Sequence, residues 1–102
     1  TQHFVALNGG PHFTHSPAAS IQVYCPDQAE LNRIWDGLLA DGGQESQCGW
    51  LKDKYGIAWQ IIPTALGRLI GDPDPTRAGR AMQAMFAMRK IVIADLEAAA
   101  AG

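Results

Sequence analysis

The sequence predicts one α+β domain in which a helix covers one face of a curved mixed sheet. Two segments, residues 20–25 and 57–62, alternate apolar and other side chains with the period of two that strands show. Between them, residues 27–39 repeat apolar side chains at helical spacing. The C-terminal part carries further helical patterns broken by proline and glycine. The predicted order is therefore β-β-α-β-β-α-α-α.

Five segments define the strands and the turns between them. A short apolar run at residues 3–7 predicts the first strand, and the turn sequence at residues 8–11 ends it. Residues 20–25 predict the second strand. Residues 46–52 and 57–62 predict a hairpin, whose second strand ends at a proline that cannot donate to a ladder.

The first helix has a start and an end signal. Asp27 is the predicted N-cap, and Glu30 completes a capping-box pattern. Gly42 and Gly43 stand where a helix end favours a left-handed residue. The apolar stripe of this helix consists of Leu31, Ile34, Trp35, Leu38 and Leu39.

Three shorter helical segments follow. Residues 64–70 predict an amphipathic helix, and Asp74 followed by Pro75 predicts the start of another that runs to about residue 88. Residues 91–93 are expected to be extended and residues 95–101 helical. The side chains of the middle helix that we expect in the core are Ala78, Ala81, Met82, Met85 and Phe86, with a pliable Met-rich binding surface as the alternative.

Composition excludes several classes of function. The chain has 102 residues, 47% of them hydrophobic and 18% charged, as in an ordinary single globular domain. A net charge of −2 offers no basic stripe for nucleic acid, and no apolar run approaches the ~20 residues that span a bilayer. We expect a cytoplasmic protein without nucleic-acid or membrane partners. The cations that we expect on a solvated helix face are Arg77, Arg80, Arg89 and Lys90.

Strand parity separates two faces of the predicted sheet. The face expected against the helix carries Ile21, Val23, Cys25, Ile57, Trp59 and Ile61. The opposite face carries Ser20, Gln22, Tyr24, Ala58, Gln60 and Ile62. A face of small and polar residues suits the concave side of a sheet around a cleft.

Gln60 is the leading candidate for a functional side chain. Its amide can ligate a hard cation or orient a carbonyl, but it cannot act as a general base. It can equally pair with Gln22 or Ser20 across the sheet as a structural group. The sequence is compatible with both interpretations.

The histidines and cysteines give weaker signals. His3, His12 and His15 lie in the first fifteen residues, and we expect them to be exposed loop residues rather than metal ligands. Cys25 and Cys48 form no CxxC pair, so we expect two free thiols. Cys48 is expected to be buried and inert, with a reactive cavity residue as the alternative.

Five ordered motifs carry a family resemblance. Residues 6–11, 27–30, 47–53, 55–63 and 72–75 carry ALNGGP, DQAE, QCGWLKD, YGIAWQIIP and DPDP. Together they resemble the PhnB-like branch of the vicinal oxygen chelate superfamily, which includes glyoxalase I, extradiol dioxygenases and bleomycin-resistance proteins. Many members of this branch carry the description 3-demethylubiquinone-9 3-methyltransferase. The resemblance implies βαβββ modules whose sheets curl around a cleft.

The resemblance also implies a place for a metal ion. Metal-dependent relatives supply a glutamate from the strand at residues 55–62, and Gln60 looks like its counterpart. A second ligand, often histidine, opens the strand at residues 20–25, where the nearest positions here are Ala18 and Ser20. The implied metals are Zn, Mn, Ni or Fe, with Gln60 as the surviving ligand.

The resemblance further implies partners and a function. Family members begin with roughly sixty residues before the segment that matches residues 3–8, so this single domain has exposed sheet edges and is expected to form a homodimer. The expected function is to hold a small ligand in a cleft. A metal-dependent lyase, isomerase or dioxygenase and a noncatalytic structural dimer are the alternatives. The expected contacts are Gln60, Gln22, Ser20, Tyr24 and, as a wall, Trp50.

The methyltransferase description has no counterpart in the motifs. The chain has no glycine-rich loop within a βαβ unit of the kind that binds a nucleoside cofactor. We therefore expect that it does not bind S-adenosylmethionine.

Overall fold

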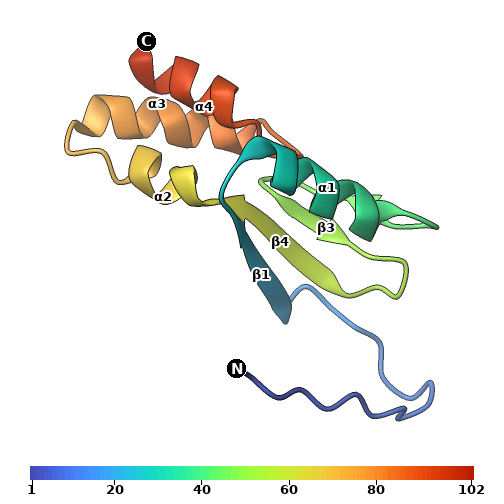
Figure 1. The fold of residues 1–102 in the computed structure, drawn as a ribbon. Helices are drawn as coiled ribbons and strands as arrows, with labels where there is room; N and C mark the ends of the chain where they lie inside the picture. Colours follow the sequence, from blue (N-terminus) through green and yellow to red (C-terminus); the bar gives the residue numbers. More distant parts are fainter.

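The computed structural model describes residues 1–102 and contains one four-stranded mixed sheet with four helices (Figure 1). The strands lie in the order β1-β4-β3-β2, with β1 parallel to β4 and the other neighbours antiparallel. Their bounds are β1 (Ser20–Cys25), β2 (Gln44–Glu45), β3 (Trp50–Lys52) and β4 (Ala58–Pro63). The helices are α1 (Gln28–Leu39), α2 (Thr64–Ile70), α3 (Pro75–Phe86) and α4 (Ile93–Ala101).

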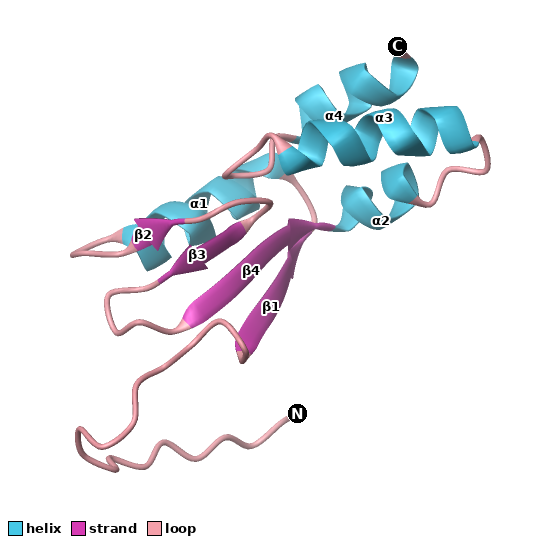
Figure 2. Ribbon diagram, turned by 180° about the vertical axis from the view of Figure 1, so that it is seen from behind, coloured by secondary structure: helices cyan, strands magenta, loops and turns pink.

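The predicted α+β class is confirmed, and the strands and first helix follow the βαβββ order that the family resemblance implies. The order β-β-α-β-β-α-α-α predicted from the residue pattern is wrong, because no strand precedes β1 and the strand β2 was not predicted. The chain passes from β1 through α1 and the β2–β3 hairpin to β4, which returns beside β1 in parallel. Helix α1 covers one face of the sheet (Figure 1). Seen from behind, the opposite face of the strands has no helix across it, and α2 and α3 lie beyond its end (Figure 2).

The main core lies between α1 and the sheet, as strand parity predicted. Leu31 and Trp35 of α1 are buried together with Ile61 of β4 and Leu51 of β3. Ile21 is the exception on this face: it lies on the edge strand, and 47% of its surface is exposed. The apolar face of the sheet is therefore closed at its centre and at Cys25, and it is open at Ile21 near the start of β1.

The ends of α1 match the prediction in part. The carboxylate of Asp27 accepts a hydrogen bond from the backbone N–H of Glu30 at 2.9 Å, which confirms the N-cap. The Glu30 carboxylate does not complete the capping box but pairs with Arg33 on the next turn. At the other end Asp41 takes the left-handed conformation ahead of Gly42, with φ of 61°.

Two predicted strands are corrected. Residues 3–7 form no strand, because nothing in the structure pairs with them. The strand predicted over residues 46–52 is limited to β3, because Cys48 and Gly49 have φ values of 57° and 85° that no strand allows. Their N–H groups instead donate to the carbonyls of Met88 and Arg89, both at 2.8 Å.

Helices α2, α3 and α4 pack together beyond the end of the sheet (Figure 1). The bounds of α2 and the Asp74 N-cap of α3 agree with the prediction. Helix α3 ends at Phe86 rather than near residue 88, and α4 begins at Ile93 rather than Asp95. The first-turn N–H of Ile93 donates a hydrogen bond to Gln28 Oε1 of α1 at 2.8 Å, a cap that local sequence cannot supply.

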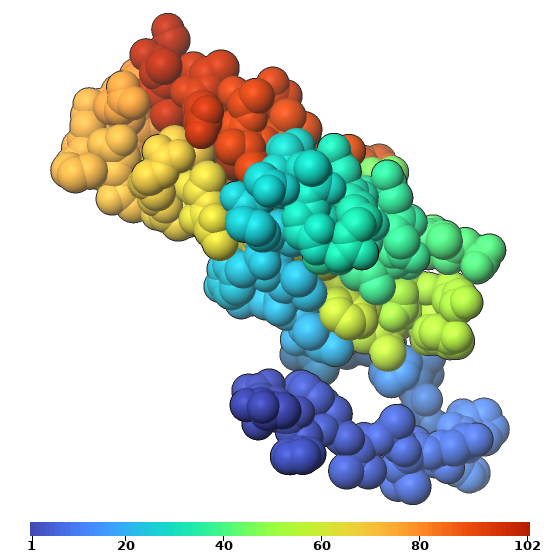
Figure 3. Space-filling view, viewed as in Figure 1, coloured from blue at the N-terminus to red at the C-terminus, as the bar shows by residue number.

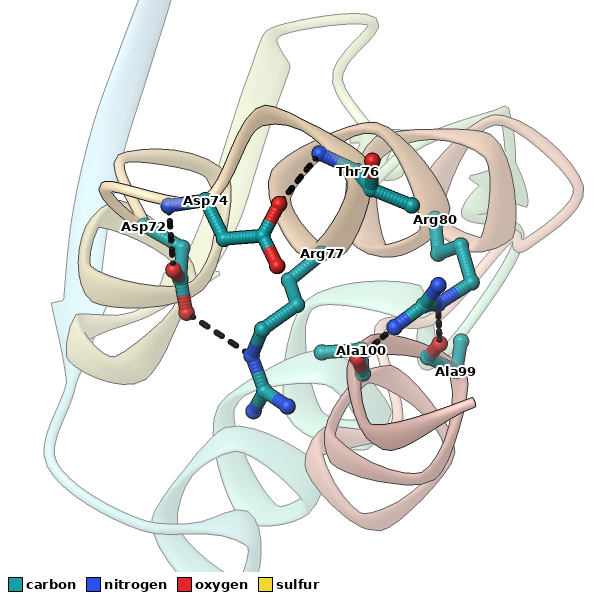
Figure 4. A network of polar contacts seen from close by, with 7 residues as sticks. All are labelled: Asp72, Asp74, Thr76, Arg77, Arg80, Ala99 and Ala100. Atoms are coloured by element: carbon teal, nitrogen blue, oxygen red, sulfur yellow. Dashed lines mark hydrogen bonds and ion pairs between the residues drawn. The ribbon is translucent and has the colours of Figure 1, made fainter.

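Two members of the predicted solvated cationic face have structural partners instead (Figure 4). Arg80 donates to the carbonyls of Ala99 and Ala100 at 3.0 and 2.7 Å and so caps the C-terminal end of α4. Arg77 pairs with Asp72 at 3.2 Å in the loop before α3. The helix face is therefore partly an anchor for α4.

Residues 1–19 contain no helix or strand and extend away from the rest of the molecule (Figure 3). Four large apolar side chains of this segment are each at least 85% exposed, namely Phe4, Val5, Leu7 and Phe13. No helix of the structure has the length and apolar character required to cross a bilayer.

Candidate functional site

The face of the sheet opposite α1 carries a row of polar and aromatic side chains. In the strand register Gln22 of β1 lies beside Gln60 of β4, which lies beside Trp50 of β3. Since residues in register point to the same face, the three side chains form one row across three strands. Tyr24 and Ile62 form the next row toward the end of the sheet.

The polar side chains of this face form a continuous hydrogen-bonded chain. Tyr24 donates its hydroxyl to Gln22 Oε1 at 3.2 Å, and Gln22 Nε2 donates to Gln60 Oε1 at 3.0 Å. Gln60 Nε2 in turn donates to Ser20 Oγ at 2.8 Å. The alternative of mutual pairing across the sheet is therefore realised, and it fixes the direction of both amides.

A hollow of about 510 Å³ opens over this row, at the junction of the sheet with α2 and α3. Its strand side contains Gln22, Tyr24, Trp50, Gln60 and Ile62. Its helix side contains Leu66, Gly67, Ile70, Met85 and Phe86. Four of the five side chains predicted as ligand contacts line the hollow, and the fifth, Ser20, lies behind Gln60 as its acceptor.

Cys48 also lines the hollow, at the point where the loop before β3 meets the α3–α4 connection. It is half-buried and has no disulfide partner. Glycine is favoured at Gly49, since its φ is 85° and a Cβ atom would lie 3.0 Å from Ile61 O and from Ile91 Cδ1. Close packing at Gly49 therefore places Cys48 and Trp50 beside the hollow.

Cys25 contrasts with Cys48. It is fully buried under α1, and this burial raises the pKa of its thiol, with the nearby carboxylates of Glu30 and Asp27 acting in the same direction. Both cysteines are free, as predicted. The expectation that Cys48 is buried is wrong, because the positive φ of its backbone turns it toward the hollow edge.

The residues around Gln60 do not fit a divalent metal ion. Its oxygen already accepts from Gln22, and its neighbours Ser20 and Gln22 are neutral groups of low ligand strength. No three His, Cys, Asp or Glu side chains of the chain come together in a ligating cluster. His12 and His15 are exposed in the N-terminal segment, as expected.

Sequence reasoning missed the helix side of the hollow. Met82 and Phe86 of α3 were expected in the core, yet Met82 is 38% and Phe86 54% exposed, and Phe86 lines the hollow with Met85. The apolar stripe of α3 predicted that its side chains would be buried, but it did not predict which element they would pack against. That depends on how α3 packs against the rest of the fold.

Comparison with known proteins identifies the family. The sequence profile of the 3-demethylubiquinone-9 3-methyltransferase family matches residues 1–62, more than half of the chain. The chain belongs to this family. The match confirms the family that the five motifs predicted, and it contains β1, α1, β2, β3 and all of β4 except its last residue.

A solved structure resembles part of the chain. A PhnB protein from Bacillus cereus is 31% identical in a structural alignment that covers 54% of this chain and 50% of that chain, with a TM-score of 0.49. The chain thus spans about half the length of that relative. No curated protein matches the chain. The family match includes Gln22, Trp50 and Gln60, whereas the helix side of the hollow lies outside it.

Proposed function

We propose that this member of the 3-demethylubiquinone-9 3-methyltransferase family is a PhnB-like domain of the vicinal oxygen chelate type that binds a small molecule in the hollow over its open sheet face. One observation carries the proposal: Gln22, Trp50 and Gln60 come from three strands and converge with α2 and α3 on one concave site. The volume of about 510 Å³ lies in the range of small-molecule sites.

A binding role is favoured over a metal-dependent reaction. The side chains next to Gln60 are the amide of Gln22 and the hydroxyl of Ser20, which both hydrogen-bond to Gln60 and provide no negative charge for a cation. The site also contains no carboxylate or histidine for general acid or base work. Its side chains can orient a molecule and shield it from water.

The thiol of Cys48 offers a direct test of binding in the hollow. The rate at which Ellman's reagent modifies Cys48 would be measured with and without three naphthalene probes, 2-acetylnaphthalene, 2-ethylnaphthalene and 2-naphthoate. Protection by at least one probe, reduced in Trp50→Ala, is the expected result. Tyr55→Ala removes an exposed ring outside the hollow and serves as the control. If no probe slows the reaction, or if Trp50→Ala leaves protection unchanged, the proposal is wrong.

The methyl-transfer function named in the family description is not what we propose for this chain. The hollow contains no carboxylate to pair with the amino group or ribose hydroxyls of S-adenosylmethionine. Isothermal titration with S-adenosylmethionine should give no binding heat at micromolar protein. A dissociation constant in the micromolar range would contradict this part of the proposal.

We also propose that the chain forms a homodimer. Strand β1 has β4 as its single neighbour, so its outer edge leaves backbone hydrogen-bonding groups open to another strand. The apolar side chains of residues 1–19 add surface that a second copy can cover. Size-exclusion chromatography with light scattering should show a dimer, and a stable monomer at micromolar concentration would disprove it.

A further inference from the structure

The chemistry of the hollow restricts the kind of molecule that it can hold. We infer that the ligand is an uncharged, mainly apolar molecule with a flat ring and one carbonyl or hydroxyl oxygen. This inference rests on the proposed binding function and adds the chemical class of the ligand. Three properties of the lining support it: the absence of charged side chains, the hydrogen-bonding capacity of the glutamine amides and the aromatic rings.

The lining of the hollow contains no Asp, Glu, Lys, Arg or His. Lys52, the charged residue of β3 on the same face, pairs in register with Ala58 and does not line the hollow. A charged ligand would lose water here without meeting an opposite charge, which is costly. The site therefore favours uncharged molecules over anions and cations.

The polar row has two N–H donors to spare for a ligand. Each glutamine amide has two N–H groups, and the chain of hydrogen bonds uses one from Gln22 and one from Gln60. One N–H of each amide is left, and Gln22 Oε1 and Gln60 Oε1, which each accept one hydrogen bond, keep a second lone pair. Two spare donors side by side on neighbouring strands match the lone pairs of a carbonyl or hydroxyl oxygen.

The rest of the lining is aromatic and aliphatic. Trp50 lies in register with Gln60, and Tyr24 and Phe86 stand at the opening, 62% and 54% exposed. Aromatic side chains favour stacked or edge-to-face contact with a ring. Met85 adds a flexible, polarisable surface on the helix side. A ring can thus occupy the apolar part while its oxygen reaches the amides.

The same three naphthalene probes test this class, because they share one ring system. 2-Acetylnaphthalene is neutral with a carbonyl, 2-ethylnaphthalene lacks the oxygen, and 2-naphthoate is an anion. Titrations followed by the ¹⁵N side-chain amide signals of Gln22 and Gln60 should show 2-acetylnaphthalene binding at least about tenfold more tightly than 2-naphthoate. It should also bind more tightly than 2-ethylnaphthalene and move both amide signals.

Two variants test whether the glutamine amides cause the tighter binding of 2-acetylnaphthalene. Gln60→Leu should remove the advantage of 2-acetylnaphthalene over 2-ethylnaphthalene. Gln44→Leu, an exposed position on β2 outside the hollow, should keep it. Equal binding of these two probes to the unmodified chain would overturn the inferred oxygen contact.

The outcomes separate the two proposals. If 2-naphthoate protects Cys48 and binds as tightly as 2-acetylnaphthalene, the ligand class is wrong while binding in the hollow stands. If no probe protects Cys48 or moves the amide signals, both proposals fail together.

Discussion

The two faces of the sheet differ although the same strands build them. Under α1, side chains such as Ile61 and Leu51 are buried in a continuous apolar core. On the other face, Gln60 and Gln22 lie half-buried or exposed in a hydrogen-bonded row. Adjacent residues of β4 thus have opposite environments. One strand can therefore contribute to the hydrophobic core with one face and leave the other face available for binding.

The largest effect should come from the covered face. Ile61→Ala removes a fully buried side chain and leaves a cavity beneath α1, so it should lower the free energy of unfolding by about 2–4 kcal/mol. Ile62→Ala, the neighbouring residue on the open face, is the matched control and should cost about half as much or less. Urea unfolding followed by circular dichroism measures both. Equal losses would show that the two faces contribute alike.

Gln28 extends the covered face to the last helix, and its loss should have the next largest effect. Its side chain donates to Ile91 O and accepts from Ile93 N, at 3.0 and 2.8 Å. Gln28→Leu leaves these part-buried backbone groups without their partner, which should cost about 1–3 kcal/mol. Gln44→Leu on the exposed strand β2 should change stability little. Comparable losses in both variants would argue against this anchoring role.

Asp53 supports the covered face in a pH-dependent way. Partial burial acts to raise the pKa of this carboxyl, but hydrogen bonds from Trp59 Nε1 and from the backbone N–H groups of Ile57 and Tyr55 outweigh it. The pKa therefore lies below its ordinary value of 3.8. A lowered pKa stabilises the fold at pH values above the ordinary one, and this contribution is lost as the pH falls through the folded-state value.

The corresponding test uses Asp53→Asn. Urea midpoints at pH 7 and near pH 3 should differ less in this variant than in the unmodified chain. The lowered pKa of Asp72, held down by the Asp74 N–H and by Arg77, should leave part of the dependence in place. An unchanged difference between the two pH values would show that Asp53 does not carry this contribution.

The smallest effect on stability should come from the open face. Gln60→Leu breaks two hydrogen bonds, but Gln22 is exposed and can turn to water, so the loss should stay below about 1 kcal/mol. Urea unfolding provides the measurement, next to the Ile61→Ala variant. A loss above about 2 kcal/mol would make the amide row a structural element and weaken the contrast between the faces.

Local sequence determined the parts that depend on neighbouring residues. The period of two in β1 and β4, the N-caps Asp27 and Asp74, and the bounds of α2 follow from short-range sterics and hydrogen bonding. Parity also predicted that Gln22 and Gln60 share a face, which the register confirms. The family followed from ordered motifs, because such motifs are written directly in the chain.

Only the tertiary structure decided which distant groups meet. Cys48 and Gly49 leave the predicted strand because carbonyls of the α3–α4 connection accept their N–H groups. Gln28 and Arg80 cap the two ends of α4 from other helices. Phe86 turns to the hollow rather than the core. Each outcome depends on how helices pack against the sheet, and no local pattern of residues specifies that packing.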